Sequence, residues 1–221
     1  MAAPPPFTEV ARRPDAQLDE LALAMAAEFR PIDAAAVLAE LDALGAELRE
    51  LVAAGEPGPV GEARACAELL GGRHGFTGDR EHYDDPDNSM LDRVLARRRG
   101  LPILLSVVYV EVARRAGVAL AGVGLAGHYV VGHFGATPPY LLDPFAGGEP
   151  LEVRQPDPLV RPWSPHETVM RMLNNLVGSY QRRGDIGKAI CAGELRVQLP
   201  AEASLAEAMR AELRAMQARL N

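Results

Sequence analysis

A histidine and an aspartate at the ends of two apolar segments are the residues of this sequence best suited to chemistry. His128 opens the segment "HYVVGHF" and Asp143 closes the segment "PYLLD". Both segments have the composition of strands, and a turn near Gly135 would fold them into a hairpin that brings the two side chains together. A carboxylate that holds an imidazole is the orienting half of a nucleophile–base–acid triad. The pair therefore predicts either a catalytic base or a structural hydrogen bond at a strand edge.

A nucleophile for such a triad is expected on the segment "GLPILLSVVYVEVARRAG", residues 100–117. Its apolar residues cover all faces, which predicts a central, buried helix with Pro102 in the first turn. A helix N-terminus favours a thiolate or an oxyanion, but position 102 holds a proline. Ser106 follows one turn later, about 6 Å further along the helix axis. It is a candidate nucleophile if His128 also lies deeper, or else a buried hydroxyl bonded to a backbone carbonyl one turn back.

The other polar residues favour structural roles. Cys66 and Cys191 are predicted to be small buried side chains. His133 is expected to face solvent, and His166 to be a surface residue or a helix cap. Glu111 interrupts the apolar helix, so we expect an ion pair with one of three arginines, Arg93, Arg98 or Arg115.

A polar loop at residues 73–90 precedes the central helix. It is long and contains Phe76 and Tyr83, and structured loops of this length often carry function. Its "DDPDNS" stretch favours Asx turns before a helix over a metal site, although the potential ligands are His74, His82, Asp84, Asp85 and Asp87.

The elements that must position His128 and Asp143 predict an α+β fold. Apolar residues recur at helical spacing from Leu18 to about Gly72, short strands follow Gly117, and helical spacing returns from Pro165. This pattern predicts a helical N-terminal part, a central helix packed on a small antiparallel sheet, and a helical tail. We expect three parts, a flexible N-terminus at 1–16, an α+β domain at 17–160 and the tail at 161–221.

The tail contains a segment, "NNLVGSYQRRGDIGKAI", that resembles one tetratricopeptide repeat. A single repeat cannot bury both faces of its two helices. The tail is therefore predicted to dock on the main domain or on a partner, with Trp163 holding the linker to the core.

Composition limits the classes of partner and the cellular compartment that we expect for this protein. The net charge of −7 argues against binding to a nucleic-acid backbone, which requires a cationic surface. No apolar run approaches the ~20 residues that cross a membrane, and the N-terminus lacks the pattern of a signal peptide. Two isolated cysteines suit a reducing cytoplasm. We expect a cytoplasmic protein without a metal or cofactor, and oligomeric state is left open.

Taken together, these segments resemble the transglutaminase-like branch of the papain-type cysteine peptidase superfamily, and above all the bacterial SirB-type proteins. The residues that carry the match are "NSMLDRVLARRRGLPILLSVVYVEVARRAGV", "GVGLAGHYVV", "LLDPFAGG" and the tetratricopeptide-like tail. By this resemblance, the catalytic histidine of the superfamily corresponds to His128 and its aspartate to Asp143. The position of the cysteine falls at or beside Pro102, where the subfamily itself favours proline.

The resemblance leaves different functions open. The first is a protein without catalysis that binds a peptide or protein in the former active-site cleft and uses the tail as a second docking surface. The second is a hydrolase or acyl/amide transferase in which His128 is the base, Asp143 orients it, and Ser106 or an activated water attacks. A third is a scaffold in which only the helical tail matters.

Overall fold

The computed structural model describes residues 3–151 and 160–219. The strands expected after Gly117 form one antiparallel sheet in the order β3-β4-β5-β6. Its strands are β3 (Leu120–Leu125), β4 (His128–His133), β5 (Tyr140–Asp143) and β6 (Glu149–Leu151). A turn that contains Gly135 joins β4 to β5 and sets His133 opposite Tyr140. The predicted α+β class is thus confirmed.

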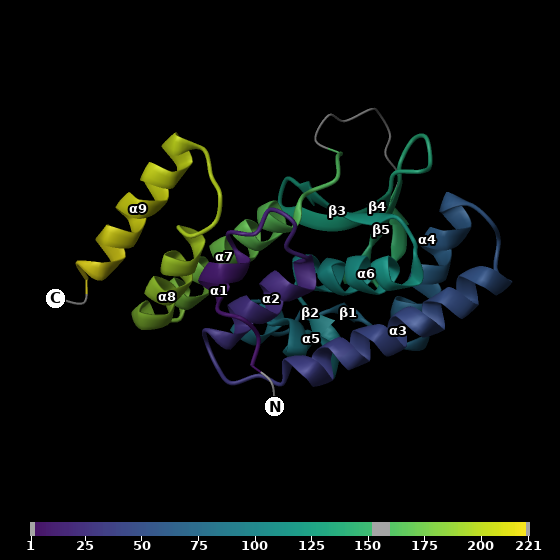
Figure 1. The fold of residues 1–221 in the computed structure, drawn as a ribbon, viewed down its shortest axis with the longest axis horizontal. Helices are drawn as coiled ribbons and strands as arrows, with labels where there is room; N and C mark the ends of the chain where they lie inside the picture. The colour runs from purple at the N-terminus through teal and green to yellow at the C-terminus, as the bar shows by residue number, and fades with distance from the viewer. Residues whose placement is uncertain (1–2, 152–159, 220–221) are drawn as a thin grey trace.

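Helix α6 (Pro102–Ala116) packs beneath this sheet and is the predicted central helix (Figure 1). Pro102 occupies its first turn, where a missing N–H group leaves no hydrogen bond unmade. Gly117 ends the helix in the left-handed conformation, at a φ of 81°. The helix is buried over most of its length, as its apolar residues predict.

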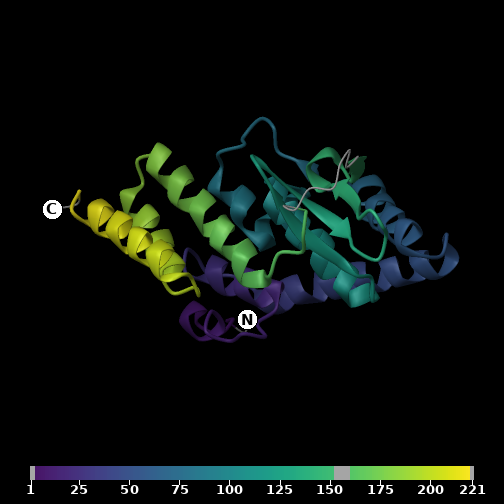
Figure 2. The ribbon, with the colours of Figure 1, turned by 90° about the horizontal axis from the view of Figure 1, so that it is seen from above.

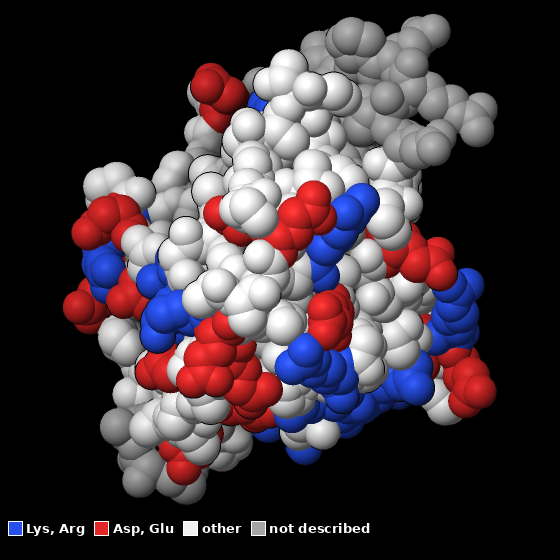
Figure 3. Space-filling view, turned by 90° about the vertical axis from the view of Figure 1, so that its right-hand side faces the viewer, with Lys and Arg blue, Asp and Glu red and all other residues white. Residues whose placement is uncertain are grey.

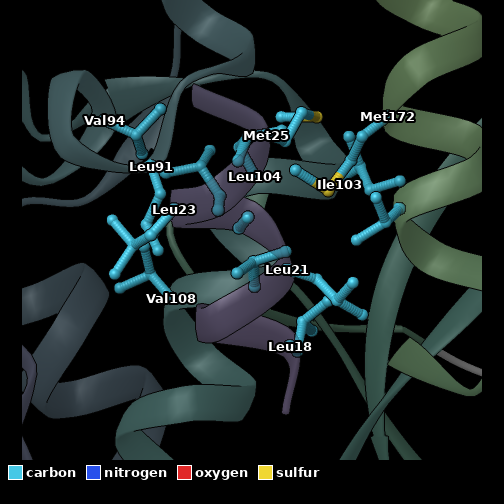
Figure 4. Close-up of a cluster of buried hydrophobic side chains, with 14 of the residues drawn as sticks. Leu18, Leu21, Leu23, Met25, Leu91, Val94, Ile103, Leu104, Val108 and Met172 are labelled. Atoms are coloured by element: carbon cyan, nitrogen blue, oxygen red, sulfur yellow. The ribbon is translucent and has the colours of Figure 1, made fainter. Parts of the chain in front are cut away.

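The N-terminal third of the chain is helical. Its helices are α1 (Phe7–Val10), α2 (Leu18–Ala27), α3 (Ala34–Ala54), α4 (Pro59–Ala67) and a π-helical continuation of α4, η1 (Glu68–Arg73). Of these, α2 and α3 pack against α6 on the side away from the sheet (Figure 1). Asp33 caps α3 and Gly55 ends it. Figure 4 shows Leu21 and Leu23 of α2 among the side chains of α6, and Met172 from the tail completes this core.

The structure corrects the expectation for residues 1–16. Of the described part of this segment, Phe7 and Val10 are fully buried, and Ala11 and Ala16 are buried with them. A proline-rich composition suggested a loose segment, but a few apolar residues are enough to fix it against α2.

The segment between η1 and α6 is held by a polar network. It contains β1 (Thr77–Gly78), a 3₁₀ turn η2 (Pro86–Ser89), α5 (Leu91–Arg97) and β2 (Arg99–Gly100), and β1 pairs with β2 in parallel. The side-chain amide of Asn88 donates to Asp79 Oδ2 at 3.2 Å and to the His82 carbonyl at 2.8 Å. Arg97 donates to the same Asp79 oxygen. The predicted Asx turn is present, since Asp85 accepts from the N–H of Asp87.

The tail consists of α7 (Pro165–Arg182), α8 (Ile186–Arg196) and α9 (Ala203–Gln217), which lie side by side at one end of the molecule (Figures 1 and 2). Helix α7 packs against α2, so the tail docks on the main domain. Trp163 holds the approach to α7, because its backbone N–H donates to the Gly122 carbonyl at 2.9 Å and its ring meets Tyr129 edge to face.

Glu111 is the buried carboxylate of α6. It accepts from Arg115 at 2.7 Å and from Arg114 at 2.6 Å, and both arginines also reach the buried Asp19 of α2. Burial and the nearby Asp19 raise the pKa of Glu111. The expected pairing with Arg115 is thus confirmed, and it ties α6 to α2.

The end of the molecule that carries α3 and α4 exposes acidic and basic side chains next to one another (Figure 3). Ion pairs such as Arg64–Glu56 at 3.0 Å belong to this mixed surface. Among the described residues, no helix has both the length and the apolar character that crossing a membrane requires.

Candidate functional site

His128 and Asp143 form the hydrogen-bonded pair that the sequence predicts. His128 Nε2 lies 2.9 Å from Asp143 Oδ2. The His128 side chain is 30% exposed and the Asp143 side chain is 17% exposed, so the imidazole meets solvent while its partner is mostly enclosed. The β4–β5 ladder ends at the pair Val131 and Leu142, so His128 and Asp143 lie just beyond its last paired residues.

The backbone after β5 fixes the aspartate. Asp143 caps a short 3₁₀ turn, η3 (Pro144–Ala146), and its Oδ1 atom accepts from the N–H of Phe145 at 2.9 Å. Both carboxylate oxygens are therefore engaged, one by the backbone and one by His128. A carboxylate that accepts from Nε2–H leaves the other ring nitrogen, Nδ1, with its lone pair. Within the described part of the chain, Nδ1 has no hydrogen-bond partner.

An aromatic and cationic surface adjoins His128. The ring of Phe145 meets the His128 ring edge to face, with centroids 6.5 Å apart, and meets the Tyr83 ring at 6.0 Å. The guanidinium of Arg80 lies 5.3 Å from the centre of the Phe145 ring. Arg80 and Tyr83 are exposed, and both come from the polar loop before α5. The sequence pointed to this loop and to Tyr83, but not to its proximity to His128.

Ser106 is fully buried on α6. Its hydroxyl donates to the Pro102 carbonyl at 2.8 Å, which is the backbone hydrogen bond considered as its alternative role. No hydrogen bond joins it to His128 among the described residues. To act as a nucleophile, Ser106 would have to break that bond and become accessible.

The two cysteines lie away from the tip of α6. Cys66 is fully buried in α4, and burial raises the pKa of its thiol to about 12. Cys191 is half-buried in α8, and burial raises the pKa of its thiol as well. A thiol must be ionised to attack, so neither group has the character of a cysteine nucleophile at neutral pH.

Tyr109 is a buried polar residue that sequence reasoning missed. It belongs to α6, and its hydroxyl is enclosed without a hydrogen-bond partner in the described chain. Burial, together with Cys66 and Asp143, raises the pKa of this phenol. The hydroxyl lies against Gly71 and Gly148, so it touches the backbone that follows Asp143. Two glycine pairs, Gly71-Gly72 and Gly147-Gly148, are the sequence signal for this close approach.

Of the two other histidines beside helices α4 and α7, His133 differs from expectation. His133 is buried rather than solvent-facing, because Glu62 of α4 covers it and bonds its Nε2 at 2.8 Å. His166 is partly buried at the start of α7, with Nε2 3.1 Å from the carbonyl of Ala11. The potential metal ligands of the polar loop do not converge, since the described residues contain no group of three or more that could hold a metal ion.

His128 begins β4 and Asp143 ends β5, and the central helix α6 lies beside them. This arrangement agrees with the comparison to known families. The sequence profile of the transglutaminase-like superfamily matches residues 35–175. The chain belongs to the transglutaminase-like superfamily. The matched region extends from α3 to the middle of α7 and includes α6, His128 and Asp143.

The curated relatives are similar over part of their length. A UPF0162 protein of Xylella fastidiosa (strain 9a5c) is 34% identical over 145 residues, which cover 57% of this chain and 52% of that protein. A UPF0162 protein of Vibrio cholerae is 41% identical over 46 residues, which cover 21% of this chain and 17% of that protein. The chain spans about half the length of the Xylella relative that it matches. No solved structure matches the chain.

Proposed function

We propose that this protein is a non-catalytic member of the superfamily, of SirB type, and that the surface around His128 and Asp143 binds a peptide or protein segment. The observation that carries the proposal is an oriented, accessible imidazole in a chain with Pro102 at the tip of α6. The thiol of Cys66 and the hydroxyl of Ser106 are sealed in the interior. A site with a base but no nucleophile retains the ability to bind.

The groups around His128 suit a polypeptide. The free Nδ1 atom can accept a hydrogen bond from a peptide N–H. The rings of Phe145 and Tyr83 offer an apolar wall, and Arg80 adds a cation. Arg80 has no ion-pair partner in the part of the chain that the structure describes, so an acidic side chain of the ligand would complement it.

The proposal also assigns a binding role to the tail. We assign residues 17–160 to the transglutaminase-like domain and 161–221 to a tetratricopeptide-like tail. Its helix pair α7–α8 turns at Gly184, with a φ of 73°, and small residues face the packed side, as such a repeat requires. The tail would then supply a second docking surface beside the His128 site.

A second function is hydrolysis by an activated water, and the free Nδ1 atom is the observation that favours it. His128 would take a proton from water at Nδ1 while Asp143 stabilises the imidazolium through Nε2–H. Ser106 is the weaker nucleophile for this alternative, because it is buried and bonded to the Pro102 carbonyl.

Binding to a peptide array distinguishes the two functions. We expect His128→Ala to weaken the selected peptides at least tenfold, as loss of a buried or oriented hydrogen bond does. His74→Ala is the matched control, because His74 is also paired with a carboxylate, Glu47 at 2.8 Å, away from the site. Mass spectrometry of the incubated peptides should show no cleavage or transfer. Unchanged binding in His128→Ala would overturn the proposed site, and turnover that His128→Ala abolishes would establish the second function.

A further inference from the structure

A pocket of about 150 Å³ lies between the polar loop before α5 and helix α7. The loop contributes Tyr83 and Ser89, α7 contributes Asn175 and Gly178, and Leu101 adjoins the start of α6. The pocket is therefore built jointly by the main domain and the tail. It is distinct from the His128–Asp143 pair, which does not line it.

The charged groups of the pocket already have partners. Asp84 is paired with Arg182, and Asp85 accepts from Arg97 at 3.2 Å. A ligand that carries a net charge would have to displace one of these pairs. The charge balance of the pocket therefore favours an uncharged ligand group.

Ser89 and Asn175 are uncharged polar side chains of the pocket that remain available. Ser89 is 1% exposed, and its hydroxyl makes no hydrogen bond within the described part of the chain. The carboxamide of Asn175 likewise has no partner among the described residues. Among the described residues, the Ser89 hydroxyl is not one of the fully enclosed side-chain atoms that lack a partner, so it is reached from the pocket, where a ligand group would satisfy it. A carboxamide can donate to a carbonyl and accept from an N–H, which are the two groups of a peptide bond.

The volume indicates a portion of a larger ligand. Pockets that enclose a complete small molecule or cofactor occupy roughly 300–1,000 Å³. A pocket of about 150 Å³ is smaller than this range and suits a short piece of a polymer.

The pocket adjoins the surface around His128. The ring of Tyr83 lines the pocket and also contacts Phe145, whose ring contacts His128. Leu101, which lines the pocket, immediately precedes the tip of α6. One extended chain could therefore pass from His128 across the two aromatic rings into the pocket.

We propose that this pocket is a subsite for the main chain of an extended polypeptide, held by Ser89 and Asn175 through an uncharged peptide group. The inference rests on the proposed function, since it makes the pocket a continuation of the peptide-binding surface at His128. The tail thereby takes part in binding the same ligand as the main domain.

Gly178 offers a way to fill the pocket without disturbing the fold. A Cβ atom at this position would meet only the Arg182 guanidinium, at 3.2 Å, which is the far end of a flexible side chain. Gly178→Leu should therefore fill the pocket while it improves the helix propensity of α7. Gly187→Leu is the matched control, because Gly187 lies in the first turn of α8 and a Cβ there approaches only Asp185, at 3.9 Å.

The test is an NMR titration of the full chain with N-acetyl-alanine-N′-methylamide, a blocked residue that has two peptide groups and no charge. We expect saturable shifts of the Ser89 backbone amide and of the Asn175 side-chain amide at millimolar concentration. Gly178→Leu should weaken this binding at least tenfold, Ser89→Ala should weaken it several-fold, and Gly187→Leu should leave it unchanged. Absence of the shifts, or equal shifts in Gly178→Leu, would overturn the subsite.

Charged probes and a longer peptide complete the experiment. Stronger shifts with acetate or methylguanidinium would overturn the preference for an uncharged group. A blocked six-residue peptide of alanine and serine should also shift the imidazole signals of His128. Shifts at Ser89 and Asn175 without any at His128 would contradict the proposed function and its link to the pocket, and shifts at His128 alone would contradict only the subsite.

Discussion

At the scale of single residues, hydrogen bonds to backbone groups decide what the polar side chains of this protein can do. Ser106 donates to the Pro102 carbonyl, whereas Asp143 accepts from the Phe145 N–H and is hydrogen-bonded to His128. Glu167 is a third case, because it accepts from the Ser164 N–H at 2.9 Å while Ser164 accepts from the Glu167 N–H at 3.2 Å. This capping box begins α7 and thus the docked tail.

The capping box predicts a pH dependence of stability. The hydrogen bond from Arg161 lowers the pKa of Glu167 to about 2, and Ser164 contributes in the same direction. A carboxyl group whose pKa is lowered by folding stabilises the fold above its ordinary pKa near 4.5, and this stabilisation is lost as the pH falls toward 2. We expect Glu167→Gln to lower the free energy of unfolding by about 1 kcal/mol or less at pH 7, since the Glu167 side chain is 41% exposed.

Urea unfolding at pH 6, 4 and 2.5 measures this effect. The difference between wild type and Glu167→Gln should shrink as the pH falls. Glu207→Gln is the control, because Glu207 is exposed on α9 and has no ion pair among the residues that the structure describes. A constant difference at all three pH values would contradict the assignment to Glu167.

At the scale of elements, the π-helical turn η1 packs directly on the backbone that carries Asp143. A Cβ atom on Gly71 would lie 1.7 Å from the Gly147 carbonyl oxygen, whereas a Cβ atom on the neighbouring Gly72 would meet nothing within 4 Å. The structure therefore has space for a side chain at Gly72 but not at Gly71. Only Gly71 is required for the close contact between η1 and the segment after β5.

Alanine substitutions at these two positions should have different effects on stability. Gly71→Ala should lower the free energy of unfolding by about 1–3 kcal/mol, since the backbone of residues 143–148 must shift. It should also weaken ligand binding at His128, because Asp143 begins that segment. Gly72→Ala should be neutral or stabilise by up to about 1 kcal/mol. Equal urea midpoints for the two variants would contradict this packing.

At the scale of the whole molecule, the tail is part of the core. Val169, Met172, Leu173 and Leu176 of α7 are fully buried in the same cluster as side chains of α2 and α6. Figure 4 shows Met172 in this cluster. Helix α9 packs mainly on α8, and its most buried residues are Met209 and Met216. We therefore expect α7 to contribute more than α9 to the stability of the protein.

Two truncations test this difference. A chain that ends at residue 200 should retain the cooperative unfolding of the main domain, with a modest loss from the exposed face of α8. A chain that ends at residue 164 should aggregate or unfold, since each large apolar side chain removed from a core costs about 2–5 kcal/mol. Circular dichroism during thermal unfolding measures the stability of both truncated chains. A stable, soluble chain that ends at residue 164 would show that the tail is an independent unit.

The secondary structure of the site was predictable because it depends on local pattern. The strand-like composition of the segments at His128 and Asp143, with a turn near Gly135, predicts the hairpin, and the apolar run after Pro102 predicts α6. Both are present. The expectation for His133 was wrong because strand alternation says which face a residue occupies but not what covers that face. Here α4 covers His133 with Glu62.

The sequence by itself determined the fold class, the central helix with its proline, and the partnership of His128 with Asp143, because periodicity and motif spacing are properties of neighbouring residues. Only the tertiary structure decided which side chains surround that pair. Arg80, Tyr83 and Phe145 meet beside His128, and Ser89 and Asn175 share a pocket although one comes from the loop before α5 and the other from α7. These contacts follow from the docking of α7 and of the polar loop, which depends on the burial of distant apolar surfaces and leaves no local signature in the sequence.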